Sequence, residues 1–254
     1  MARPDIITIP ILPLGMVNAF LLIVPGGAVL IDAGLPGSER KIRRALAGAG
    51  LTSADLKLIV VTHGHIDHAG DARALRDLSG APILMHEADI AYCQGEQPLL
   101  RPTGAFGRIF KMTGAIEAPF PHFTPDIVLS GSEERSLTEF GVKGRVLPTS
   151  GHTPGSISLL MDDGTVFAGD LAASGILLGG IALRNRPRQP PFEEDPAEVA
   201  ASLRMLLERG ARRFYLGHGG PLGAAAIQRH VARLERPSAM QGSTRLKSAV
   251  SEAD

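Results

Sequence analysis

Short apolar runs alternate with longer amphipathic segments along most of this chain. Runs such as 57–61 and 82–85 are aliphatic and bounded by turn residues, which predicts buried strands. Segments 38–49 and 69–78 instead carry apolar residues at helical spacing, and Ser38 is placed to cap the first of these helices. The pattern predicts an α/β protein.

The apolar N-terminal region is divided by turn residues. Prolines and glycines interrupt residues 6–31, so this region predicts short strands rather than a membrane helix. The Pro25-Gly26-Gly27 turn predicts a hairpin whose second strand ends at Asp32.

A second half of similar organisation begins near residue 126. Its apolar runs predict strands at 136 onward, 142–147, 156–161 and 165–168, and its helical patterns cover 195–208 and 223–234. Asp195 at the N-cap, followed by a proline, marks a strong helix start. We expect a single domain over residues 1–236, with halves of about 1–125 and 126–236, and a polar, flexible tail at 237–254.

Four side chains that can bind metal lie within one short segment. The run from Thr62 to Ala69 contains His63, His65, Asp67 and His68, directly after the strand predicted at 57–61. Histidines and carboxylates at such spacing are the usual signature of a metal site. The carboxyl end of a strand is also where α/β proteins place their chemistry.

Three further candidates follow later apolar runs in the same manner. His152 lies in a Gly/Pro turn between two predicted strands, Asp170 ends the run 165–168, and His218 follows a third apolar run between glycines. With the first cluster they make seven candidate ligands, enough for two sites that share one carboxylate.

This ordered set resembles the metallo-β-lactamase fold hydrolases, in particular their glyoxalase II and lactonase branches. The resemblance implies a four-layer αββα sandwich of two mixed β-sheets flanked by helices. It implies one metal on His63, His65 and His152 and a second on Asp67, His68 and His218, bridged by Asp170. Asp32 would orient the metal-binding loop from behind, although an Asx-turn role fits its position equally.

The same resemblance implies a dinuclear hydrolase. A hydroxide bridging two divalent ions would attack a small ester, thioester or lactone, and Asp67 would pass a proton to the leaving group. Zinc suits these ligands, as do iron and manganese. Cys93 is the only cysteine and lies far from Asp170 in sequence, which disfavours β-lactam hydrolysis.

Two other classes stay open, namely oxidoreduction and a non-catalytic metal-binding or interaction protein on the same scaffold. The second is disfavoured because no ligand position is lost. Persulfide dioxygenases look similar and hold a single iron through residues that match His63, His152 and Asp170. Phosphoester hydrolysis is less favoured. A glutathione-specific glyoxalase II is disfavoured because about one helix follows His218, and Ala173 stands where the best-known lactonases carry a tyrosine.

Composition limits the partners. The chain has 26 basic and 26 acidic residues, so it shows no electrostatic footprint for nucleic acid or an anionic membrane. One cysteine and no signal-peptide pattern fit a reducing compartment. We expect a cytoplasmic protein with a small-molecule substrate and no nucleic-acid or membrane partner.

Two irregular segments are candidates for pocket walls. The lid-like insertion 94–125 carries Phe106, and the segment 175–191 carries Arg184 and Arg186. These side chains could bind an apolar moiety and an anionic group. Equally, the arginines could be solvated at the surface, and the phenylalanine could pack in a local core or in a homodimer contact.

Three histidines remain outside the ligand set. We expect a structural role for His86, an exposed surface position for His230 and a surface or pocket position for His122.

Overall fold

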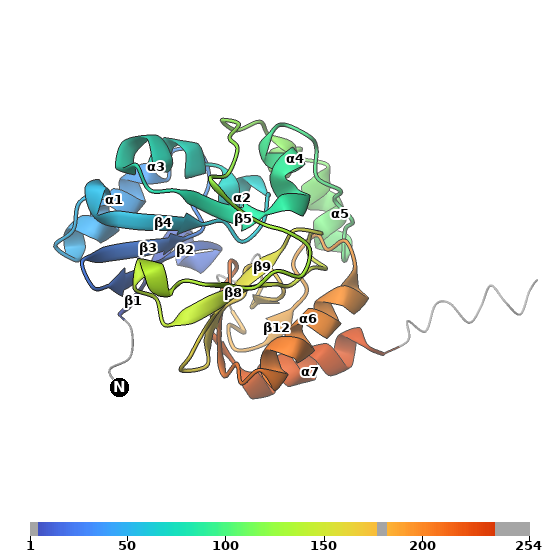
Figure 1. Cartoon of the computed structure of the whole chain (residues 1–254). Helices are drawn as coiled ribbons and strands as arrows, with labels where there is room; N and C mark the ends of the chain where they lie inside the picture. The colour runs from blue at the N-terminus through green and yellow to red at the C-terminus, as the bar shows by residue number, and fades with distance from the viewer. Residues whose placement is uncertain (1–4, 177–181, 237–254) are drawn as a thin grey trace, which may run out of the picture.

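Two six-stranded sheets stack face to face in the computed structural model, with helices on both outer faces (Figure 1). The structure describes residues 5–176 and 182–236, and the predicted tail 237–254 lies outside them. This arrangement confirms the predicted four-layer αββα sandwich of mixed sheets. No helix in these described ranges is long and apolar enough to cross a membrane.

The first sheet has the order β1-β2-β3-β4-β5-β6, antiparallel from β1 to β3 and parallel from β3 to β6. Its strands are β1 Ile6–Leu12, β2 Val17–Val24, β3 Gly27–Ile31, β4 Leu56–Val60, β5 Ile83–His86 and β6 Ile127–Leu129. Helices α1 (Glu39–Gly48) and α3 (Ala72–Ser79) cover its outer face in the upper part of Figure 1.

The second sheet has the order β14-β13-β10-β9-β8-β7. Its strands are β7 Arg135–Ser136, β8 Gly144–Pro148, β9 Ile157–Met161, β10 Thr165–Phe167, β13 Arg213–Tyr215 and β14 Leu222–Gly223. Helices α6 (Pro196–Glu208) and α7 (Ala224–Leu234) cover the opposite face of the molecule (Figure 1). The remaining elements are α2 Ile66–Ala69, α4 Ile90–Cys93, α5 Ala105–Lys111 and the small β11–β12 pair, Ala173–Ser174 with Pro187–Arg188.

Alternation along the central strands explains why they form three apolar layers. In β2, Phe20 and Leu22 belong to the core between the sheets, whereas Ala19 and Leu21 belong to the core beneath α1 and α3. Successive side chains in a strand point to opposite faces, so a strand buried on both sides must be apolar throughout. Burying each large aliphatic side chain contributes about 1.5–3 kcal/mol, and this layering is therefore the main source of stability.

Strand direction brings distant residues to one edge of the sandwich. The parallel strands β3 and β4 place Asp32 directly after the last residue of β3 and Thr62 two residues after the end of β4. In the second sheet the parallel pair β10–β13 aligns Phe167 with Tyr215, so Asp170 and His218 each follow by three residues. The backbone N–H of Ile157 donates to the Thr62 carbonyl at 2.8 Å and joins the two sheets at this edge.

The predicted helix cap at Asp195 is confirmed, whereas the one at Ser38 is wrong. Asp195 caps α6, accepting hydrogen bonds from two backbone N–H groups. Ser38 makes no side-chain cap at α1. The carboxylate of Asp71 accepts the Glu39 N–H instead, so a residue distant in sequence satisfies the helix start.

The helix predicted at 69–78 is interrupted at Gly70, which separates α2 from α3. Leu78, which the helical spacing predicts to lie on the apolar face, is 48% exposed. The insertion 94–125, predicted to be irregular, contains the helix α5. The strand β6 still belongs to the first sheet, so this sheet extends past the expected division near residue 125.

The surface position expected for His230 is wrong, because its side chain is fully buried on the inner face of α7. Both of its ring nitrogens are buried without a hydrogen-bond partner among the described residues. Burial, reinforced by nearby Arg233, lowers the pKa of His230 to about 4. The helical periodicity of α7 is compatible with this inward position, but charged neighbours in sequence obscure it.

We predict that His230 makes the fold sensitive to acid. The unfolded chain takes up a proton near the ordinary histidine pKa of 6.5, which the folded state does not, so stability falls as the pH drops from 6.5 towards 4. Replacing His230 by leucine should reduce the loss of unfolding free energy between pH 7 and pH 5 by about 2 kcal/mol, measured by urea denaturation. The exposed His122→Leu is the matched control, and an equal change in both variants would contradict this explanation.

Candidate metal centre

The structure brings all seven candidate side chains together at the shared edge of the two sheets. Their possible ligand atoms form three overlapping groups, each within 4.8 Å: His63, His65 and His152; His63, His68 and Asp170; and Asp67, His68 and His218. The first and third groups are the two triads that the resemblance implied. All seven residues are at most 9% exposed.

Asp170 lies between the two triads. One carboxylate oxygen is 3.4 Å from His68 Nε2, and the other is 2.8 Å from His218 Nε2 and 3.7 Å from His152 Nε2. Asp67 approaches the same histidines from the side, with its Oδ2 3.4 Å from His218 Nε2 and 3.9 Å from His68 Nε2. A carboxylate in this position can serve both triads.

Several polar atoms of this cluster have no protein partner. Four imidazole nitrogens and one oxygen of Asp170 are buried without a hydrogen bond in the described structure: His63 Nε2, His65 Nε2, His68 Nε2, His152 Nδ1 and Asp170 Oδ1. His65 Nδ1 and His152 Nε2 face each other at 3.1 Å. Unsatisfied buried polar atoms are costly, and convergent imidazole and carboxylate donors fit a divalent cation.

Hydrogen bonds on the far side of the rings fix their orientation. Asp32 Oδ2 lies 2.8 Å from His68 Nδ1 and also accepts from the hydroxyl of Thr62 at 3.0 Å. The same hydroxyl oxygen is 3.1 Å from His63 Nδ1, so it accepts the proton of that nitrogen while donating to Asp32. His218 Nδ1 donates to the carbonyl of Met16 at 2.5 Å. Each bond engages Nδ1, so Nε2 is the nitrogen that a metal ion could use.

Asp32 adopts a left-handed backbone conformation with φ of 61°. This conformation is uncommon outside glycine and is kept where the surroundings fix it. Here the Asp32 N–H donates to Val60 and its Oδ1 accepts from the Thr62 N–H at 2.8 Å. The Asp32 carboxylate therefore bonds to the segment after β4, whereas an Asx turn would need a bond to the N–H two residues further on.

The electrostatics separate the histidines into two kinds. Burial lowers the pKa of His63 and His152 well below its usual value, so both side chains are neutral near pH 7. Burial opposes protonation of His68 as well, but the carboxylates of Asp170, Asp32 and Asp67 outweigh it and raise the pKa to about 10. In the same way Asp170 raises the pKa of His218 to about 9. The carboxylates thus favour positive charge at this site, whether protons or metal ions supply it.

Comparison with known proteins agrees with this geometry. The family model of the metallo-β-lactamase superfamily matches residues 12–218. The chain belongs to this superfamily. It is 30% identical over 211 residues to the probable metallo-hydrolase YflN of Bacillus subtilis, a match that covers 78% of this chain and 77% of the relative.

Further relatives place the chain among metallo-hydrolases in general. A hydroxyacylglutathione hydrolase of Anaeromyxobacter dehalogenans is 31% identical over 151 residues, but the match covers 59% of this chain and only 44% of that enzyme. A metallo-β-lactamase family protein from Thermus thermophilus superposes with a TM-score of 0.64 at 26% identity, covering 98% of this chain and 83% of its own. These findings support a metal-dependent hydrolase, and the His/Asp cluster indicates divalent metal binding.

Two residues that support this superfamily site were not recognised from the sequence. Asn18 is buried in β2 and its amide donates to the carbonyls of Gly15, Leu216 and Gly219, which holds the His218 loop against the N-terminal turn. Thr62 links Asp32 to His63. A polar residue inside an otherwise apolar strand is the signal that could have identified Asn18.

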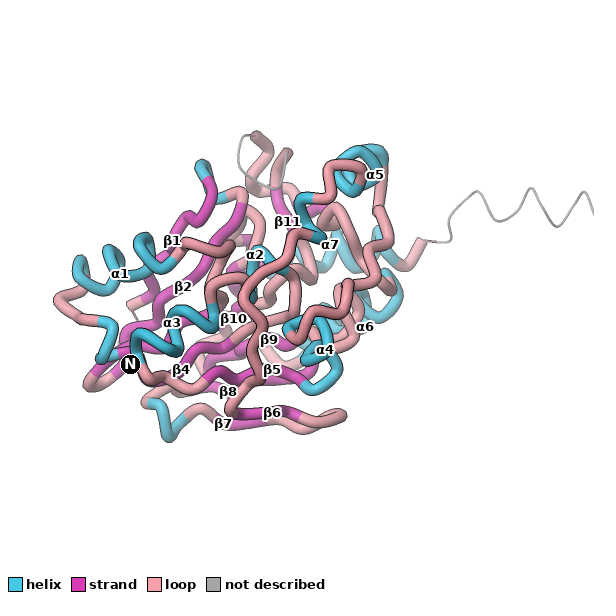
Figure 2. The backbone as a smooth tube through the Cα atoms, turned by 90° about the horizontal axis from the view of Figure 1, so that it is seen from above, coloured by secondary structure: helices cyan, strands magenta, loops and turns pink. Residues whose placement is uncertain are grey.

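The predicted substrate residues have different surroundings. Phe106 lines a cavity of about 190 Å³ between α5 and the β11–β12 segment, which lie on the same side of the molecule (Figure 2). Arg184 and Arg186 are both exposed, and a Cβ added at Gly15 would lie 3.7 Å from the Arg184 guanidinium. Arg188, which is outside the predicted set, lines the same cavity as Phe106.

The other histidines lie outside the cluster. His86 Nε2 is 2.9 Å from the Gly131 carbonyl and its Nδ1 accepts from the Ala88 N–H, which fits the expected structural role. His122 is exposed and borders a small cavity of about 50 Å³ beside Gly64.

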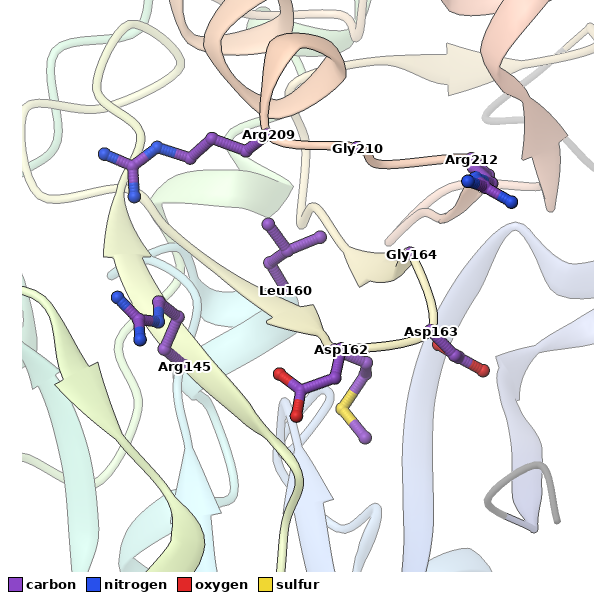
Figure 3. A pocket seen from close by; sticks show the side chains of 9 residues that line it. Arg145, Leu160, Asp162, Asp163, Gly164, Arg209, Gly210 and Arg212 are labelled. Atoms are coloured by element: carbon purple, nitrogen blue, oxygen red, sulfur yellow. The ribbon is translucent and has the colours of Figure 1, made fainter. Parts of the chain in front are cut away.

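A separate cavity of about 740 Å³ lies at the β9–β10 turn, and Arg145, Arg209, Arg212, Asp162 and Asp163 are among the residues that line it (Figure 3). His152 and Asp170 flank the opposite ends of the same two strands. The size of a cavity therefore does not locate the chemistry of this protein.

We predict that Asp32→Asn weakens metal binding by about 10–100-fold, because the amide cannot accept from both Thr62 and His68 as the carboxylate does. Competition with a chromophoric chelator for Zn²⁺ measures the change. Asp162→Asn, at the exposed far turn, should retain wild-type affinity. Equal affinities for both variants would show that Asp32 does not orient the ligands.

Proposed function

We propose that this protein is a dinuclear metal-dependent hydrolase of a small ester, thioester or lactone. The observation that carries the proposal is the position of Asp170 between two His-containing triads. His63, His65 and His152 would hold one ion, Asp67, His68 and His218 the second, and Asp170 both. Zinc is the first choice of metal, and iron or manganese suits the same donors. Two such ions, when bound, polarise a carbonyl oxygen and lower the pKa of water.

Asp67 is the proposed proton carrier. At 9% exposure it is the most exposed of the seven residues, so its carboxylate borders the side from which substrate and water would arrive. A carboxylate at this position can accept a proton during attack and return it to the departing oxygen or sulfur. The thiol of Cys93 cannot act as the nucleophile, because it is buried in the core beneath α1 and α3 and burial raises its pKa.

The cavity lined by Phe106 is the proposed binding place for the organic part of the substrate. Its wall at Ala173 stands three residues after Asp170, and the next N–H, of Ser174, donates to the His218 carbonyl. Apolar surface from Phe106 and Ile176 suits a short hydrocarbon arm. The arginines at 184, 186 and 188 supply positive charge for an anionic end. A dimer contact across the insertion 94–125 stays a prediction.

The function is tested with a panel of substrates in metal-loaded protein: a p-nitrophenyl ester, an acyl thioester, a γ-lactone and a bis-p-nitrophenyl phosphodiester. We expect hydrolysis of members of the first three classes, loss of activity with chelator and recovery on adding metal. Asp170→Ala should retain the fold by circular dichroism, lose most of its bound metal and lose at least about 100-fold in kcat.

Asp162→Ala is the matched control and should retain activity. Exclusive cleavage of the phosphodiester, or unchanged turnover in Asp170→Ala, would contradict the proposal. If protein that holds one iron consumed oxygen with glutathione persulfide, the protein would be a dioxygenase and not the proposed hydrolase.

A second prediction concerns the arginines. Arg184→Ala, Arg186→Ala and Arg188→Ala should raise KM for substrates with a carboxylate several-fold more than KM for neutral analogues of the same length. Steady-state kinetics with paired substrates measure the ratio. Arg145→Ala, at the far cavity, provides the control, and an equal effect on both substrates would make these arginines ordinary surface residues.

A further inference from the structure

Asp89 is a buried carboxylate to which the proposed chemistry gives no part. It precedes α4, and its side chain is fully buried. One oxygen, Oδ2, accepts from the Gly64 N–H at 2.8 Å and from the Thr153 hydroxyl at 2.7 Å. The other, Oδ1, accepts from the Gly155 N–H at 2.7 Å. All three of these partners are neutral, so their hydrogen bonds offset part of the cost of burying the group.

The three donors lie beside ligands from both halves of the chain. Gly64 separates His63 from His65 in the loop after β4, whereas Thr153 and Gly155 follow His152 in the turn before β9. These two loops are about ninety residues apart in sequence. A single carboxylate therefore holds the backbone on both sides of one triad.

The space around Gly64 and Gly155 is too small for a larger side chain at either position. A Cβ at Gly155 would lie 2.6 Å from Asp89 Oδ1, and one at Gly64 would lie 2.9 Å from Tyr92 Cβ and 3.1 Å from the Asp89 carbonyl. Neither glycine has a positive φ, so lack of space rather than backbone conformation requires them. The turn is braced further because the Ser156 hydroxyl lies 2.8 Å from that of Thr153.

The second triad is held by other groups. Asp32 orients His68, and the Met16 carbonyl orients His218. Asp89 makes none of these bonds. Its influence should therefore fall on His63, His65 and His152.

We infer that Asp89 is a positioning residue that sets the distance between His63–His65 and His152, and so the affinity of one of the two metal sites. The 3.1 Å separation of His65 Nδ1 and His152 Nε2 is the geometry it maintains. The inference rests on the proposed dinuclear site.

The test is a stepwise Zn²⁺ titration of metal-free protein against a competing chelator. Asp89→Asn keeps the shape of the side chain but turns an NH₂ group towards N–H donors, so one binding step should weaken about 10–100-fold while the other changes less than about threefold. Asp55→Asn is the matched control, since Asp55 accepts similar bonds from Thr52 at an exposed turn. It should leave both steps unchanged.

Thr153→Val provides a second variant should Asp89→Asn fail to fold. It removes one of the three donors and should weaken the same step by a smaller factor. The inference would be overturned if both Zn²⁺ binding steps weakened in proportion to a loss of thermal stability. It would also be overturned if neither step weakened. Wild-type protein that binds two ions but hydrolyses nothing would refute the proposed function alone, whereas an active wild type with an unshifted Asp89→Asn would refute this inference alone.

Discussion

Crowding of seven polar side chains in a buried space is the constraint on which the rest of this structure depends. Five imidazoles and two carboxylates converge where the two sheets meet, and several of their atoms have no hydrogen-bond partner among the described residues. Such an arrangement is costly unless positive charge compensates the carboxylates and accepts the nitrogen lone pairs. Asp170 is central because its two oxygens face different histidines.

Hydrogen bonds on the outer side of the cluster hold its seven side chains in place. Asp32, Asn18 and Asp89 each connect segments that are distant in sequence, and each is at most 2% exposed. Because these three side chains are embedded in the ends of apolar strands and turns, the three hydrophobic layers give them fixed positions. Stability and site geometry are thus supplied by the same packing.

The sequence could predict those features that depend on local order. The seven ligand candidates each follow a recognisable apolar run, and the run from Asp195 to Glu198 is enough to predict the helix cap at Asp195. Contacts between segments that are distant in sequence could not be predicted in this way. Asp71 rather than Ser38 receives the first N–H of α1, and the burial of His230 depends on how α7 packs. Asp89 falls in the same class, since its three donors come from two loops that only the folded sheets bring together.

The most direct test of the central claim is the metal content of protein purified without added metal or chelator, determined by elemental analysis. The geometry predicts close to two equivalents of divalent metal per chain, falling to well below one in Asp170→Ala with the fold retained. One equivalent of metal that persists unchanged in that variant would contradict a shared carboxylate between two sites.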